Sequence, residues 1–218
     1  SNLDILYSNY SSNGNAIIRR YSGIKAQITL AATDLTYFEF DSTPTAFTVS
    51  PYTTNSSTLF VGTVLGDIFK VEEADTDFQT WTELELNNFI VGSISDIELG
   101  DSEDEIFVTI HNYGVENIWY TNDGGTTWQT KEGNLPDMPV KCILRNPLNH
   151  EEVIIGTELG VWYTTNFSDS SPNWSPAFNG MTNVKVLDLD LRVKFTTLPL
   201  EPLRFIRFLV SHFSGSSF

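Results

Sequence analysis

Two aspartates that alternate with leucines are the first candidates for acid–base chemistry in this sequence. Asp188 and Asp190 lie in the run Val-Leu-Asp-Leu-Asp-Leu at residues 186–191. Alternate side chains of a β-strand point to the same face, so a strand here would present both carboxylates together. The pair could serve as acid and base in glycoside hydrolysis if a further carboxylate faced it across a cleft. The polar face of a half-buried strand gives the same pattern, and we favour that interpretation.

Two tryptophans, Trp119 and Trp162, are candidates for stacking on a ligand. Each is followed directly by a tyrosine, and Phe69 takes the corresponding place earlier in the chain. On an open groove these rings would stack on sugar rings or on an apolar peptide. Packing between neighbouring sheets explains the same regular placement without a ligand, and it is the interpretation we favour.

Metal and cofactor chemistry finds little support in the sequence. The acidic run Asp-Ser-Glu-Asp-Glu at residues 101–105 lacks the alternating ligands and the glycine of a calcium loop, so we interpret it as a solvated turn. His111, His150 and His212 have no partner at metal-ligand spacing. Cys142 is the only cysteine and lies in an apolar run, as a small buried hydrophobe would. We therefore predict neither a metal site nor a cofactor.

The composition limits the classes of partner. The chain of 218 residues carries 12 basic and 28 acidic residues, a formal charge of −16. This charge argues against nucleic acid as a partner, because phosphate binding needs a basic surface. No apolar stretch reaches the ~18 residues that cross a membrane, so membrane insertion is not expected. High acidity, many Ser, Thr and Asn residues and a single cysteine favour a secreted or cell-surface bacterial protein.

An internal repeat predicts the elements that must position these side chains. Three apolar runs, at residues 60–63 (Phe-Val-Gly-Thr), 107–110 (Phe-Val-Thr-Ile) and 154–157 (Ile-Ile-Gly-Thr), follow one another at intervals of 47 residues. An opening strand precedes each run, a second strand-like segment follows it, and a tryptophan closes the unit. Three anchors that keep one register over three copies indicate a repeated structural unit.

The repeat predicts an all-β fold. Helical periodicity is absent, and the short β-branched or aromatic runs separated by Gly, Asn, Asp and Pro are typical of sheets. Four short strands in a repeat of 47 residues match one blade of a β-propeller. We therefore predict four-stranded antiparallel blades in an incomplete propeller, since a closed ring typically needs more copies than this chain holds.

The predicted units divide the chain as follows. Residues 1–44 form a partial, irregular blade; residues 45–92, 93–137 and 138–182 form whole blades; and residues 183–218 hold the first strand of a further blade and an atypical tail. In that first strand, Val-Lys-Val at 184–186 matches Val-Lys-Cys at 140–142. Because blades are stable only when stacked, the expected partners include further blades or domains of the same polypeptide.

One hairpin carries a family motif. Residues 117–128 read Asn-Ile-Trp-Tyr-Thr-Asn-Asp-Gly-Gly-Thr-Thr-Trp, and the Asn-Asp-Gly-Gly run favours a tight turn. The spacing resembles the Asp-box of BNR, sortilin-like and xyloglucanase-like β-propellers, with Thr where Ser is more usual. The resemblance implies a structural motif between the outer strands, commonly away from the ligand-binding face. The motif residues are Thr121, Asp123, Gly125, Thr127 and Trp128.

This resemblance covers residues 45–192 and is closest to large secreted proteins of Bacteroidota-like bacteria. The phrases that carry it are Gly-Thr-Glu-Leu-Gly-Val-Trp-Tyr-Thr at 156–164 and Asn-Gly-Met-Thr-Asn-Val-Lys-Val at 179–186. It implies a non-catalytic propeller segment that acts as a scaffold or binding module, with carbohydrate or protein as its partner.

A catalytic alternative remains open. The chain could be a fragment of a glycoside hydrolase of the xyloglucanase or sialidase type, with its catalytic carboxylates partly outside this sequence. Sialidases bind a carboxylate through an arginine cluster, and none of the arginines in the repeat region stands at a recognisable position of that cluster. These arginines are Arg19, Arg20, Arg145 and Arg192.

Overall fold

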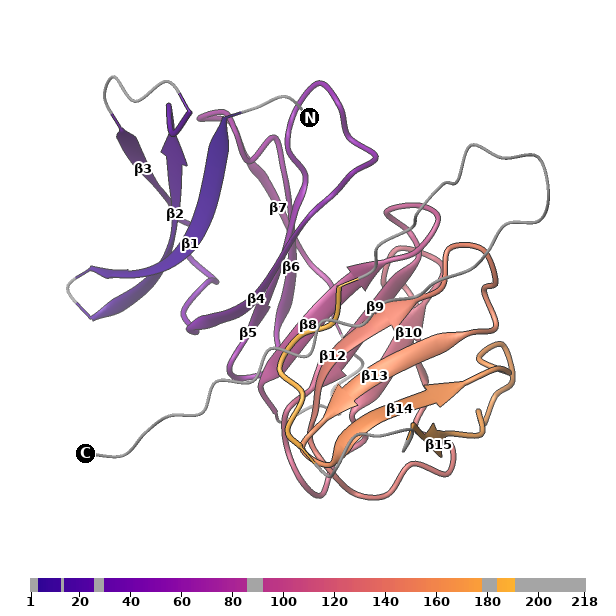
Figure 1. Cartoon of the computed structure of the whole chain (residues 1–218). Coiled ribbons are helices and arrows are strands. Elements are labelled where there is room, and N and C mark those ends of the chain that lie inside the picture. The colour runs from indigo at the N-terminus through magenta and orange to yellow at the C-terminus, as the bar shows by residue number, and fades with distance from the viewer. Residues whose placement is uncertain (1–3, 13, 26–29, 86–91, 178–183, 191–218) are drawn as a thin grey trace.

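A computed structural model of the chain describes residues 4–12, 14–25, 30–85, 92–177 and 184–190. Over these residues the regular elements are fifteen β-strands, and no helix occurs among them. The strands form one three-stranded and three four-stranded antiparallel sheets (Figure 1). The predicted all-β class with four-stranded antiparallel sheets is therefore confirmed. The described residues also contain no helix that could cross a membrane.

The first sheet has three strands in the order β1-β2-β3. β1 (Ile5–Ser12) and β2 (Asn15–Ser22) form an antiparallel hairpin, and β3 (Ala31–Leu35) pairs with β2. Gly14 lies in the hairpin turn with a φ of 85°, a left-handed conformation that glycine adopts without a Cβ clash.

Three four-stranded sheets follow, and in each of them successive strands are neighbours. The second sheet contains β4 (Pro44–Val49), β5 (Leu59–Thr63), β6 (Ile68–Glu72) and β7 (Thr80–Glu83), so it begins one residue before the blade limit predicted at residue 45. The third contains β8 (Ile94–Leu99), β9 (Ile106–Ile110), β10 (Ile118–Thr121) and β11 (Gln129–Thr130). The fourth contains β12 (Val140–Arg145), β13 (Val153–Thr157), β14 (Gly160–Thr164) and β15 (Ser175–Pro176).

The second strand of each four-stranded sheet is its most buried element. Every residue of β5 and β9 is buried, as are four of the five residues of β13. These strands contain the apolar runs of the sequence repeat. Strands covered on both faces contain continuous runs of apolar and β-branched residues rather than an alternating pattern. The repeat is therefore a consequence of each sheet being covered by neighbours on both sides.

A hydrophobic core fills each junction between successive sheets. Ile18 and Leu35 of the first sheet pack with Phe69 of the second. Trp81, which closes the second sheet, packs against this same core. Phe60, Ile97 and Trp128 lie between the second and third sheets, and Ile118, Ile143 and Trp174 lie between the third and fourth. Stacking of the sheets therefore supplies the hydrophobic cores.

The first strands of the sheets converge, because β4 contacts β8 and β8 contacts β12. Figure 1 shows β8 and β12 side by side. Each of these strands has a shift in register near its beginning, which leaves one residue outside the regular ladder. The shifts lie between Pro44 and Ala46, between Ile94 and Asp96, and between Val140 and Cys142.

Two glycines of the repeat allow close contact between neighbouring units. A Cβ on Gly62 would lie 2.3 Å from Cγ2 of Ile94, and a Cβ on Gly156 would lie 2.7 Å from Cγ1 of Val186. Val186 therefore occupies the place of Ile94, the first residue of β8. The alignment of residues 184–186 with residues 140–142 is therefore two residues out of register. The sequence favours that alignment because both triplets read Val-Lys followed by an apolar residue.

The four sheets of the described residues do not close into a ring. Over the described residues, the first sheet lies at one end of the series and residues 184–190 pack against the fourth sheet at the other (Figure 1). This arrangement agrees with the predicted incomplete propeller. The predictions for residues 183 and 191–218, including His212 and Arg192, fall outside the described residues.

Candidate functional site

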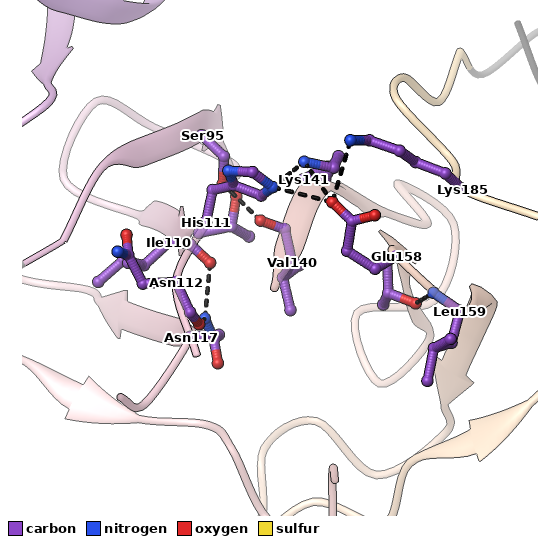
Figure 2. Close-up of polar contacts among 12 residues, drawn as sticks. Ser95, Ile110, His111, Asn112, Asn117, Val140, Lys141, Glu158, Leu159 and Lys185 are labelled. Carbon is purple, nitrogen blue, oxygen red and sulfur yellow. Dashed lines mark hydrogen bonds and ion pairs between the residues drawn. The ribbon is translucent and has the colours of Figure 1, made fainter. Parts of the chain in front are cut away.

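Four polar residues from separate segments meet near the beginning of the first strands. They are His111, Lys141, Glu158 and Lys185, here called the Glu158 cluster. His111 follows β9, Lys141 lies in β12, Glu158 follows β13, and Lys185 belongs to the segment beyond the fourth sheet. Figure 2 shows their side chains pointing toward one another.

One carboxylate oxygen is the centre of this cluster. Oε1 of Glu158 lies 3.1 Å from Nε2 of His111, 3.0 Å from Nζ of Lys141 and 3.1 Å from Nζ of Lys185. Nζ of Lys141 also contacts Nε2 of His111. Three basic side chains therefore share a single acceptor atom.

Backbone hydrogen bonds place His111 and Glu158 at equivalent points of two sheets. The amide of His111 donates to the carbonyl of Ser93 at 2.9 Å, and the amide of Glu158 donates to that of Pro139 at 3.3 Å. In both cases the acceptor precedes the first strand of the same sheet. Val64 in the second sheet makes the same contact, with Thr43 at 2.9 Å. One backbone position thus carries Val, His and Glu in successive sheets.

Lys141 occupies the residue at the register shift of β12. Its counterparts are hydroxyl residues that link one sheet to the next: Oγ1 of Thr45 donates to the carbonyl of Ile94, and Oγ of Ser95 donates to that of Val140, each at 2.7 Å. In β12 the long side chain of Lys141 takes the place of this hydroxyl, and its Nζ contacts the Glu158 carboxylate instead of a backbone carbonyl of the next sheet.

Hydrogen bonds from Asn117 fix the loop that carries His111. Asn117 donates through Nδ2 to the carbonyls of Ile110 and Asn112, at 2.7 Å each (Figure 2). The backbone amide of Asn117 donates to Oε2 of Glu132 at 2.7 Å. Burial raises the pKa of Glu132 to about 7, although backbone amides favour its charged form. These bonds hold the turn between β9 and β10 that positions the imidazole.

The electrostatics of the cluster favour an ionised carboxylate. Burial raises the pKa of Glu158, but hydrogen bonds from His111, Lys141 and Lys185 outweigh it and lower the pKa to about 2. Burial also lowers the pKa of Lys141. Two lysine side chains and an imidazole surround one carboxylate, so basic groups are in excess in this cluster although the chain has a formal charge of −16.

The cluster opens toward solvent on one side. Side-chain exposure is 10% for Lys141, 23% for Glu158, 38% for His111 and 49% for Lys185. An incoming anionic group would therefore meet Lys185 and His111 first. The cluster lies at the opposite end of the sheets from the Asp123 turn, because Thr121 pairs with Ile106 at the start of β9 whereas His111 follows its end.

The predicted Asp-box residues form a hydrogen-bonded turn. Oδ1 of Asp123 accepts from Oγ1 of Thr121 at 2.7 Å and from the amide of Thr127 at 2.9 Å, and Oδ2 accepts from Oγ1 of Thr127 at 2.6 Å. The amide of Gly125 donates to Oγ1 of Thr121 at 3.1 Å. The bonds that Thr127 and Thr121 donate to Asp123 lower its pKa to about 2. Trp128 packs into the core between the second and third sheets.

The turn after β14 repeats part of this arrangement. Oγ1 of Thr164 donates to Oδ1 of Asn166 at 2.8 Å, and the same oxygen accepts from the amide of Asn173 at 3.0 Å. An asparagine oxygen thus replaces one carboxylate oxygen of the Asp123 turn. Its side-chain nitrogen donates to Asp169 at 2.7 Å instead.

The two tryptophans considered as possible ligand-stacking residues pack between sheets. Trp119 lies against the core shared by the second and third sheets, and its Nε1 donates to the carbonyl of Glu116 at 2.9 Å. Trp162 lies against the core shared by the third and fourth sheets. Both side chains are partly buried. Their packing supports the interpretation that we favoured, and stacking on a ligand stays a prediction.

Asp188 and Asp190 are both exposed, and neither lies in an assigned strand. The buried residues beside them are Val186 and Leu189, three positions apart. The strict alternation that would place both carboxylates on one face is therefore not observed over residues 184–190. Any catalytic role for the pair stays a prediction.

A second pair of acids, which the sequence analysis did not single out, lies on β8. Asp96 links two sheets: Oδ2 accepts from the amide of Ile143 in β12 at 2.9 Å. Burial raises the pKa of Asp96 to about 6 and that of Glu98 to about 7. The sequence signal that could have identified this pair is the Asp-x-Glu spacing of Asp96 and Glu98 in the first strand of a sheet. Acidic residues alternate there with other residues, as they do at Asp188 and Asp190.

Metal ligands do not converge anywhere in the described part of the chain: no group of three or more His, Cys, Asp or Glu side chains could hold an ion there. Cys142 is buried among Val161, Val186 and Leu189, and burial raises its pKa to about 12.

Comparison with known proteins identifies a structural neighbour but no sequence family. No protein-family profile matches the chain. No curated protein matches it either. Among solved structures, the chain is similar to the crystal structure of a GH74 enzyme from Niastella koreensis, with a TM-score of 0.55 and 18% identity over 79% of this chain. The chain spans 28% of that enzyme's length. At this identity the likeness shows the fold alone.

Proposed function

We propose that this chain is a non-catalytic binding segment of a longer, secreted or cell-surface β-propeller protein, and that it binds an acidic glycan at the Glu158 cluster. The single observation that carries the proposal is the convergence of His111, Lys141 and Lys185 on one oxygen of Glu158. Their remaining N–H donors, and the positive charge of the group, suit the carboxylate of a uronic acid.

The position of the cluster supports this proposal. The first strands of successive sheets converge there, and the equivalent residue changes from Val64 to His111 to Glu158 while the backbone contact stays the same. A purely structural position in a repeat has no need for such different chemistry. A glycan is the favoured class of ligand because the structural neighbour is a glycoside hydrolase of the same fold. The predicted Asp-box, BNR-type or sortilin-like family membership is part of the same proposal.

The test is calorimetric titration of the whole chain with oligogalacturonate and with a neutral cello-oligosaccharide of equal length. We expect saturable binding of the acidic ligand only, weakened by added salt because exposed charges are screened. Replacing Lys141→Met and Lys185→Met together should weaken it at least roughly tenfold. Lys25→Met, an exposed lysine outside the cluster, is the matched control. Equal binding of both ligands, or no effect of the double substitution, contradicts the proposal.

A second candidate function, a fragment of a glycoside hydrolase, is favoured by one observation. A general acid near neutral pH needs a carboxyl whose pKa is raised, and burial raises that of Glu98 to about 7. Its catalytic partner would lie in a part of the protein outside this chain. Turnover of a β-glucan or a sialyl substrate that disappears in Glu98→Gln, with the fold intact by circular dichroism, would favour this candidate. Binding without turnover favours the binding segment.

A further inference from the structure

A hollow of about 340 Å³ lies between the third and fourth sheets, away from the Glu158 cluster. The residues that matter for its chemistry are Glu105, Tyr120, Gln129, Lys131, Glu151 and Phe167. Its volume falls at the lower end of the ~300–1,000 Å³ typical of small-molecule sites. Asn122 and His150 also line it, which places it toward the end of the sheets that carries the Asp123 turn.

The apolar wall of the hollow is a group of aromatic rings. The ring of Tyr120 lies 5.0 Å from that of Phe107 and 5.5 Å from that of Phe167, measured between centroids. Phe107 and Phe167 are buried, whereas Tyr120 is only half-buried. The two phenylalanines thus fix the orientation of the tyrosine ring that lines the hollow.

A buried ammonium group lies beside these rings. The Lys131 side chain extends from the residue after β11 to the turn between β14 and β15, and the residue is only 2% exposed. Its Nζ donates to the carbonyl of Asp169 at 2.9 Å and lies 5.6 Å and 5.3 Å from the ring centres of Tyr120 and Phe167.

The protein satisfies only part of the hydrogen-bonding capacity of this lysine. An ammonium has three N–H donors, and the Asp169 carbonyl takes one of them. Within the described residues no carboxylate lies within 4.0 Å of Nζ. Burying an ammonium costs free energy unless its donors are satisfied. Two donors therefore remain for a molecule in the hollow.

Two carboxylates that can accept hydrogen bonds, those of Glu105 and Glu151, line the hollow. Oε1 of Glu105 accepts from the hydroxyl of Tyr120 at 3.1 Å, and Oε2 of Glu151 accepts from the amide of Ser168 at 3.1 Å. Glu105 is also paired with Arg145, whose Nη1 lies 3.4 Å from Oε2, so the lining carries no excess of positive charge that would favour an anionic ligand. The side-chain amide of Gln129 adds both a donor and an acceptor.

We infer that this hollow is a binding site for a single neutral pyranose ring. Such a ring has an apolar C–H face that packs on Tyr120, and hydroxyls that accept from Lys131 and donate to Glu105 and Glu151. The site is separate from the Glu158 cluster and selects a neutral sugar rather than an acidic one. A chain with both sites would hold a glycan whose neutral and acidic sugars are recognised at opposite ends of the sheets.

The test uses the whole chain and three probes: methyl β-glucopyranoside, methyl β-xylopyranoside and sodium glucuronate. Saturation-transfer NMR and titration of the Gln129 and Asn122 side-chain amide signals report binding at the hollow. We expect the Gln129 and Asn122 signals to respond to both neutral glycosides at lower concentrations than to glucuronate, whose binding at the Glu158 cluster these signals do not report. Tyr120→Leu and Lys131→Met should weaken binding of the neutral glycosides at least roughly tenfold.

Tyr163→Leu is the matched control, because Tyr163 takes the equivalent place in β14 and does not line the hollow. If Tyr120→Leu or Lys131→Met does not fold, Gln129→Ala decides, since Gln129 is exposed and its loss should weaken binding by a few-fold. The inference is overturned if no pyranoside shifts the Gln129 and Asn122 amide signals, if glucuronate shifts these signals at the lowest concentration, or if Gln129→Ala binds the neutral glycosides as the parent does. None of these outcomes depends on oligogalacturonate binding at the Glu158 cluster.

Discussion

His111 and Glu158 are separated by 47 residues, one repeat of the sequence, and their side chains meet with Nε2 and Oε1 3.1 Å apart. They occupy the same backbone position in adjacent sheets. Stacking of repeats therefore brings equivalent positions side by side, so two substitutions at one repeat position create an acid–base contact. This relationship explains how a repetitive scaffold can build a local polar cluster without any change of fold.

We predict that Glu158→Gln destabilises the fold by about 1–2 kcal/mol at neutral pH, after allowance for solvent screening. The native carboxylate has its pKa lowered from the ordinary 4.5 to about 2. Its contribution is therefore fully present above 4.5 and is lost as the pH falls toward 2. The variant should lose this part of the acid dependence. Urea unfolding of both proteins across this pH range provides the measurement.

Glu85→Gln is the control for that experiment, because Glu85 is exposed and lies outside the cluster. It should keep the stability of the parent. A Glu158→Gln protein whose acid unfolding runs parallel to that of the parent would show that Glu158 contributes nothing to the fold through its charge.

Asp123 should stabilise the turn between β10 and β11 through its charged form. Hydrogen bonds from Thr127 and Thr121 lower its pKa from 3.8 to about 2. The stabilisation is present above 3.8 and disappears as the pH falls toward 2. Asp123→Ala should therefore lower the urea midpoint at neutral pH and flatten the acid dependence, without changing glycan binding.

Asn122→Ala is the matched control for the turn, because Asn122 is the exposed neighbour of Asp123. Its urea midpoint should equal that of the parent. If Asp123→Ala unfolds at the same midpoint as Asn122→Ala, the hydrogen bonds of Asp123 do not stabilise the hairpin.

The sequence predicted the strands well because burial repeats in it. The runs in β5, β9 and β13 are apolar because neighbouring sheets cover them, and Trp128 and Trp174 recur because each fills a junction between sheets. Those constraints act at every copy, so they appear as periodicity. The stacking of four-stranded sheets follows from this periodicity and could therefore be predicted from the sequence alone.

The Glu158 cluster was not predictable in the same way. Its four residues lie on separate segments, and His111 looked isolated because no partner stands near it in the sequence. The available signal was a difference between copies: Val64, His111 and Glu158 follow the same apolar run. Lys185 was missed because its segment was aligned two residues out of register. Burial of Lys131 likewise depends on the neighbouring sheet, which the sequence of its own hairpin does not contain.

Gly156 should be essential for docking of residues 184–190. A Cβ there would lie 2.5 Å from Sγ of Cys142 and 2.7 Å from Cγ1 of Val186. Gly156→Ala is therefore expected to cost about 1–3 kcal/mol by overpacking. Removing the facing side chain with Val186→Ala should relieve part of this cost. Urea unfolding of the two single variants and the double variant measures the coupling.

The double variant should be more stable than the sum of the single effects predicts, by at least about 0.5 kcal/mol. Additive effects would mean that Val186 does not face Gly156, and the placement of residues 184–190 against the fourth sheet would be wrong.

Glu98 should respond to pH in the opposite direction from Glu158 and Asp123. Burial raises its pKa from 4.5 to about 7, so the folded state binds its proton more tightly than the unfolded state does. The contribution of Glu98 to stability is therefore greatest below 4.5 and is lost as the pH rises through about 7. Glu98→Gln removes the buried charge and should be more stable than the parent by about 1–2 kcal/mol at mildly alkaline pH.

Thermal unfolding at several pH values on either side of neutrality tests this, with Glu85→Gln as the exposed control. A stability difference that does not grow with pH would show that the Glu98 carboxylate is not desolvated, and would also remove the reason to consider it as a general acid.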